Sequence, residues 1–151
     1  MSNSQIIEIC ALYIPVILML ITALSARIYP RLRVAILLTT LWQAASLPWI
    51  NFVAIQYGWW SFSPSPWQIL GMPVSLYLGW IVSWGMLATL LMGKLPFRRA
   101  ALFVAAIALA FDLLYMPLME PVLILHSNWL IGECALLILA LAPSLILVHF
   151  T

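Results

Sequence analysis

Five long runs of apolar residues dominate this chain of 151 residues. They lie at about 6–26, 34–55, 69–93, 100–118 and 129–149, and a helix that crosses a membrane needs about 20 such residues. Only 7% of the residues are charged, compared with roughly 25% in an average soluble domain. The sequence therefore predicts an all-α polytopic membrane protein, in which five transmembrane helices form one domain over residues 1–151.

Basic residues occur in only two of the connections between these runs. The first connection carries Arg27, Arg31 and Arg33, and the third carries Lys94, Arg98 and Arg99. Short loops rich in Lys and Arg stay on the cytoplasmic side of a membrane. The sequence therefore predicts an integral protein of a bacterial inner membrane, with its N-terminus outside and its C-terminus in the cytoplasm. The small net charge of +2 gives no indication of nucleic-acid binding.

Asp112 is the acidic residue that lies deepest in a predicted span. Counted from Ala100 at ~1.5 Å per residue, it lies ~18 Å into a hydrocarbon core that is ~30 Å thick. A charge near the middle of a membrane costs at least ~2.5–3.5 kcal/mol. Asp112 shares a helical face with Ala101, Ala105 and Ala108, and small residues allow helices to pack closely in a bilayer. We therefore expect Asp112 to face the inside of the bundle.

Asp112 then has two interpretations. It is either a structural acid, hydrogen-bonded to a neighbouring helix, or a proton donor or polar anchor for a ligand. The available hydrogen-bonding partners are Gln43, Ser46, Ser75 and Ser83. Two other acids are candidate helpers. Glu133 shares a face with Trp129 near the outer end of the last span, whereas Glu120 lies between two prolines, which place it on a loop or broken turn near the surface.

Aromatic residues supply a candidate binding pocket. Tyr77, Trp80 and Trp84 follow at i, i+3 and i+7 and so share one helical face. With Trp129 and Tyr115 they are the predicted substrate-binding residues, although an aromatic stripe of this kind is also typical of helix packing. The loop QYGWWSFSPSPWQ either lies at the membrane interface or caps a hydrophobic pocket. The sequence contains no motif for a cofactor or a metal.

Three segments resemble a known family. They are GMPVSLYLGW at 71–80, DLLYMPLMEPV at 112–122 and NWLIGE at 128–133. Together they resemble the membrane segment that precedes the methyltransferase part in bacterial isoprenylcysteine carboxyl methyltransferase-like proteins, over residues from about Arg33 to the end. Ser75 stands where that family has an acidic residue. The chain contains no plausible site for the methyl donor, so we do not expect it to be a methyltransferase on its own.

More loosely, the chain resembles the lycopene-cyclase-like and hydratase-like membrane enzymes of carotenoid and terpenoid biosynthesis. That resemblance implies acid chemistry on an isoprenoid lipid, such as cyclisation or hydration, without a cofactor. Protonating an alkene needs a carboxylic acid, and aromatic faces stabilise the carbocation that forms. Asp112 would be the acid, with Glu133 and Glu120 as helpers. The alternative is a non-catalytic membrane subunit that binds a partner membrane protein or lipid.

Overall fold

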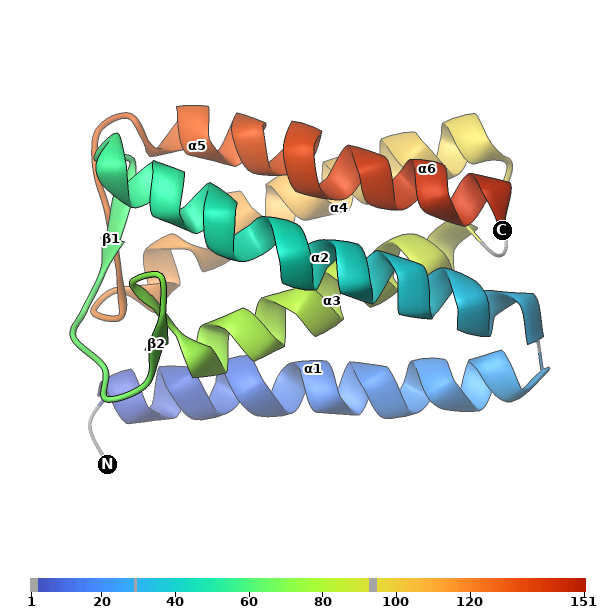
Figure 1. The fold of residues 1–151 in the computed structure, drawn as a ribbon, viewed down its shortest axis with the longest axis horizontal. Coiled ribbons are helices and arrows are strands. Elements are labelled where there is room, and N and C mark those ends of the chain that lie inside the picture. Colours follow the sequence, from blue (N-terminus) through green and yellow to red (C-terminus); the bar gives the residue numbers. More distant parts are fainter. Residues whose placement is uncertain (1–2, 29, 93–94) are drawn as a thin grey trace.

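The computed structural model describes residues 3–28, 30–92 and 95–151, which are mostly helical (Figure 1). The long helices are α1 (Asn3–Ile28), α2 (Pro30–Gln56), α3 (Val74–Met92) and α4 (Phe97–Tyr115), followed by a last rod made of α5 (Trp129–Leu136), a π-helical turn η2 (Leu137–Leu141) and α6 (Ala142–Phe150). The short elements are β1 (Trp60–Phe62), β2 (Gln68–Ile69), β3 (Met72–Pro73), a 3₁₀ turn η1 (Pro117–Met119) and β4 (Leu123–Leu125). The predicted all-α class is confirmed.

Three helical stretches are long and apolar enough to cross a membrane. They are Leu32–Gln56, Phe97–Met119 and Trp129–Phe150. Within the described residues, the apolar parts of α1 and α3 are shorter, at Gln5–Ile21 and Val74–Met86. These helices support an integral membrane protein, whereas the count of five spans and the orientation in the membrane stay predictions.

The third helix begins later than the predicted range of 69–93. Residues 68–73 instead form a small hairpin of β2 and β3, in which Ile69 pairs with Met72. Leu70 and Gly71 at its tip have φ of 49° and 86°, a left-handed backbone that an α-helix excludes. The apolar run therefore continues through a turn before the helix starts at Val74.

Helix α3 lies at the centre of the bundle and contacts α1, α2, α4 and α6. Figure 1 shows the start of α1, the end of α2 and the start of α5 at one end of the molecule, together with β1 and β2. The C-terminus, the end of α1 and the start of α2 lie at the other end. The described helices that begin near the two basic connections, α2 and α4, thus start at the same end, as the charge pattern requires.

The loop after α2 closes one end of the bundle. Strand β1 pairs antiparallel with β4, and Trp60 between them is fully buried, with its Nε1 donating to Asn51 Oδ1 at 3.0 Å. A Cβ atom on Gly132 would lie only 2.3 Å from the Trp60 ring, so the loop packs directly on α5. Trp60 packs in the hydrophobic core and Trp67 is 76% exposed, so both predicted roles for this loop stay predictions.

Candidate functional site

The buried line along α4 differs by part of a turn from the predicted one. It consists of Ala100, Val104, Ala108 and Asp112. Ala101 and Ala105 are only partly buried, so the expectation of a fully buried face through Ala101 and Ala105 was wrong. The residues of an i, i+4 row slant across a helix, and such rows are the ridges by which helices pack. The predicted burial of Asp112 itself is correct, with 5% of its surface exposed.

Two buried carboxyl groups meet between α4 and α5. Glu133 is 1% exposed, and its carboxyl group lies beside that of Asp112. A carboxylate only accepts hydrogen bonds, and neither Glu133 oxygen nor Asp112 Oδ2 meets a donor among the described residues. Protons on the carboxyl groups, or a water molecule between them, would supply the missing donors. The structure thus brings Asp112 together with Glu133, one of its two predicted helpers.

A small polar cavity lies at this carboxyl pair. Its volume is about 10 Å³, which is room for roughly one water molecule. The residues that line it are Gln43, Leu47, Trp84, Asp112, Glu133, Leu136, Leu137, Ala140 and Leu141. Of the four hydrogen-bonding partners considered for Asp112, only Gln43 lines the cavity. Ser46 instead donates to the backbone oxygen of Trp42 on its own helix.

The last rod changes its hydrogen bonding beside this cavity. In the π-helical turn η2, the N–H of Ala142 donates to the backbone oxygen of Leu137, five residues earlier. The next residue is Pro143, which has no N–H to continue an α-helical ladder, and such turns often occur at functional sites. The backbone oxygen of Ala140 accepts hydrogen bonds from Trp42 Nε1 at 3.2 Å and Gln43 Nε2 at 3.0 Å. These bonds tie α2 to the irregular turn.

A larger apolar groove lies on the other side of α3. Its volume is about 230 Å³, and it is lined by α1, α3 and α4, with the side chains of Cys10, Ala11, Ile14, Pro15, Leu18, Gly79, Trp80, Ser83, Trp84, Met86, Ile107, Ala108, Phe111 and Tyr115. Several of these residues are also exposed on the outside of the bundle, including Ile14 at 48% and Phe111 at 50%. The groove therefore opens sideways between α1 and α4, toward the surface that would contact lipid.

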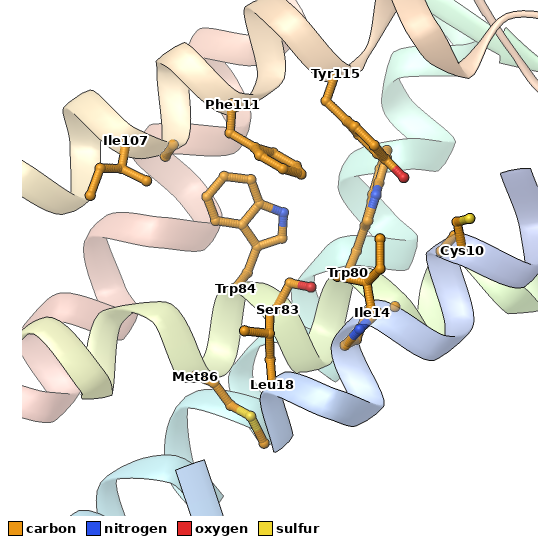
Figure 2. A pocket seen from close by; sticks show the side chains of 14 residues that line it. Cys10, Ile14, Leu18, Trp80, Ser83, Trp84, Met86, Ile107, Phe111 and Tyr115 are labelled. Atoms are coloured by element: carbon orange, nitrogen blue, oxygen red, sulfur yellow. The ribbon is translucent and has the colours of Figure 1, made fainter. Parts of the chain in front are cut away.

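Trp84 lines both spaces and separates them. Figure 2 shows its indole extending from α3 toward Phe111 of α4, with Leu18 of α1 on the opposite side. Phe111 in turn stacks on Tyr115, with 4.7 Å between the ring centroids. Ala108, one turn before Asp112, also lines the groove. Trp84 thus belongs to the lining of the apolar groove and to that of the cavity with the acid pair.

The predicted site residues divide into two groups. Asp112 and Glu133 meet at the polar cavity, and Trp80, Trp84 and Tyr115 line the groove. The others lie outside both spaces. Tyr77 Oη donates to the backbone oxygen of Ala44 at 2.9 Å, Trp129 packs against the core beneath the loops, and Glu120 is exposed at the end of η1.

Sequence reasoning did not assign a site role to two kinds of residue. Phe111 stands four residues before Tyr115, so their shared face could have been found from spacing alone. The contribution of α1 through Ile14 and Leu18 left no signal, because an apolar residue that faces a groove has the same composition as one that faces lipid. No protein-family model, curated protein or solved structure matches the chain. The family resemblances therefore stay predictions.

Proposed function

We propose that this integral membrane protein is an enzyme that acts on an isoprenoid-type lipid by acid chemistry, such as cyclisation or hydration. The observation that carries the proposal is the position of Trp84 between the acid pair and the groove. A lipid chain would enter sideways from the bilayer between α1 and α4, and its alkene would approach the acid pair past the indole.

The groove has the chemistry that a polyprenyl chain needs. Its lining is almost entirely apolar, and four of its side chains are aromatic: Trp80, Trp84, Phe111 and Tyr115. Burial of apolar surface favours binding by about 25 cal/mol per Å². Aromatic faces attract a cation within about 6 Å of the ring centre, so the same lining would stabilise a carbocation formed from the chain.

The acid pair supplies the proton. Asp112 is assigned as the donor because it lies on α4, one turn from Ala108 in the groove. Its O–H would give the proton to one alkene carbon, leaving the other carbon as the cation. In a cyclisation, attack by a second alkene and loss of a proton back to the carboxylate close the reaction. In a hydration, a water molecule adds and releases that proton instead. Glu133, on the opposite side of the cavity, would position Asp112 and accept a proton from it.

The test is turnover of a polyprenyl substrate by the purified protein in D₂O. Acid initiation places deuterium from the solvent on carbon, which mass spectrometry of the product detects. We expect Asp112→Asn to fold but to lose about 10²–10⁴-fold in rate, the usual contribution of a positioned acid. Glu120→Gln is the matched control, because Glu120 is exposed outside both spaces, and it should keep full activity.

Two results would overturn the proposal. One is full activity of Asp112→Asn. The other is the absence of any isoprenoid lipid, both among lipids extracted with the purified protein and among turnover products. The second result would instead favour the alternative of a non-catalytic subunit, in which the acid pair only holds α4 and α5 together.

A further inference from the structure

Hydrogen-bond donors line the apolar groove between α1, α3 and α4. They are the indole N–H groups of Trp80 and Trp84 and the hydroxyl groups of Ser83 and Tyr115. None of these donors makes a side-chain hydrogen bond to another residue in the described part of the chain. Elsewhere, Trp42 Nε1 donates to a backbone oxygen and Trp60 Nε1 donates to Asn51. The groove therefore offers free donors to a ligand.

Trp84 and its neighbour Ser83 lie too deep for water or lipid head groups to serve as their partners. Trp84 stands ten residues after the start of α3 at Val74, which is ~15 Å along a helix. That is half of a hydrocarbon core that is ~30 Å thick. Water is absent from this core, where an unpaired donor is costly, and a buried indole N–H usually has a partner. A ligand in the groove has to supply the acceptor.

The donors of Ser83 and Trp84 point into the same space. Figure 2 shows the indole nitrogen of Trp84 on the side that faces Trp80, and the Ser83 hydroxyl pointing the same way. Other helical hydroxyls, such as those of Ser46 and Ser144, donate to the backbone oxygen four residues earlier instead. A carbonyl oxygen has two lone pairs and can accept from two donors. This geometry favours one acceptor oxygen beside Trp84.

The acceptor in the groove is uncharged. Among the described residues that line the groove there is no Asp, Glu, Lys, Arg or His, and a charged group without a partner is strongly disfavoured in apolar surroundings. The Lys and Arg residues lie at 27–33 and 94–99, and Arg99 precedes Ile107 of the groove by ~12 Å along α4. A diphosphate head group at that end would leave hydrocarbon against the free donors. A carbonyl group fits better, because it accepts hydrogen bonds and carries no charge.

We infer that the lipid bound in the groove is an isoprenoid with a neutral carbonyl group, whose oxygen accepts hydrogen bonds from Trp84 Nε1 and Ser83 Oγ. The inference rests on the proposed function, which supplies the isoprenoid chain. An isoprenoid chain repeats one unit, so a purely apolar groove would let it slide. Because Trp84 also lines the cavity of Asp112 and Glu133, an oxygen held there would bring one particular alkene of the chain to the acid pair.

The experiment compares matched lipids on the purified wild-type protein in lipid nanodiscs, with empty nanodiscs to correct for partitioning into lipid. The lipids are ³H-labelled farnesylacetone, its analogue with CH₂ in place of C=O, and farnesyl diphosphate. We expect saturable binding of one ketone per chain, about tenfold tighter than the hydrocarbon, which corresponds to about 1.4 kcal/mol. Equal affinity for the ketone and the hydrocarbon overturns the inference. Tighter binding of the diphosphate than of the ketone overturns it as well.

Variants that delete one donor locate the oxygen. Ser83→Ala and Trp84→Phe should each lower the ratio of ketone to hydrocarbon affinity about threefold, because each removes one neutral hydrogen bond. The ratio is taken within each variant, so lost packing area affects both lipids alike. Ser46→Ala is the matched control, because its hydroxyl bonds to its own helix outside the groove, and it should keep the wild-type ratio. An unchanged ratio in both groove variants overturns the inference. Should Trp84→Phe fail to fold, the smaller change Ser83→Ala decides.

The results also separate this inference from the proposed function. Saturable binding of the hydrocarbon with no preference for the ketone overturns the carbonyl site and leaves the acid chemistry standing. A preference for the ketone without solvent deuterium in any product overturns the acid chemistry and leaves the carbonyl site standing. Absence of saturable binding for every lipid overturns both.

Discussion

The acid pair makes a prediction about stability that can be tested without knowing the substrate. Asp112 and Glu133 are both almost completely buried and line the same small cavity. Removing one partner leaves the other carboxyl group buried without its polar neighbour, which costs about 1–3 kcal/mol. Replacing both partners with apolar side chains of similar shape removes the unsatisfied group as well. Such double replacements of buried charged groups are often neutral or stabilising.

The magnitude follows from a double-mutant cycle. We expect Asp112→Leu and Glu133→Met each to lower the free energy of unfolding by about 1–3 kcal/mol. The double variant should be within about 1 kcal/mol of the wild type, because volume-conserving apolar changes cost little. With the double variant near the wild type, the coupling energy is then about 2–6 kcal/mol, at or above the upper end of the range of about 0.5–3 kcal/mol measured for residues in contact. Each single variant is destabilised because it leaves one buried carboxyl group alone. The double variant is not, because it has no buried carboxyl group at this position.

The assay is unfolding by increasing SDS in mixed micelles, followed by the fluorescence of the eight tryptophans. The matched control is Glu120→Gln, a change at an exposed carboxyl group outside the cavity, combined with Asp112→Leu. That pair should be additive within about 0.3–0.5 kcal/mol, as for independent sites. If Asp112→Leu and Glu133→Met are equally additive, the two acids do not interact and the site as described is wrong.

Three further predictions concern the packing that holds the site, and each is checked by the same unfolding assay. Gly79→Ala should cost about 1–3 kcal/mol or more, because its Cβ would lie 2.1 Å from a backbone oxygen of α1. Thr39→Val should cost about 0.6 kcal/mol and at most ~1.7, since it removes a hydrogen bond of 2.7 Å to the α3 backbone. Trp60→Phe should cost about 1–3 kcal/mol, because it leaves the buried oxygen of Asn51 without its donor. A variant as stable as the wild type would show that its contact is absent in solution.

The helices were predictable from the sequence because composition and length decide them. In a bilayer the backbone must satisfy its own hydrogen bonds, so long apolar runs become helices. The ends were less predictable. Residues 69–73 are apolar, yet the turn at Leu70 and Gly71 delays α3 to Val74. A hydropathy pattern cannot distinguish an apolar hairpin from the first turn of a helix.

The site was predictable only in part, for a related reason. Asp112 and Glu133 could be selected because charged residues in a predicted span are rare and costly. Gln43 could only be one of several polar partners, since its position depends on how α2 is rotated against the last rod. The π-helical turn beside it, which precedes Pro143, also fixes that rotation. Periodicity describes one helix at a time, whereas the cavity is formed jointly by α2, α3, α4 and the last rod.

Trp84 is the residue at which the enzyme and scaffold interpretations separate most clearly. It lines both the groove and the polar cavity, so truncating it would join the two spaces. In a scaffold, that change only removes packing and lowers stability. In an enzyme, it also exposes the acid pair to lipid and water, so turnover would change far more than stability does. Trp80 lines the groove but not the cavity. The same truncation at Trp80 therefore removes a similar packing area without joining the two spaces. The difference in turnover between the two variants then isolates the role of the Trp84 side chain between the groove and the acid pair.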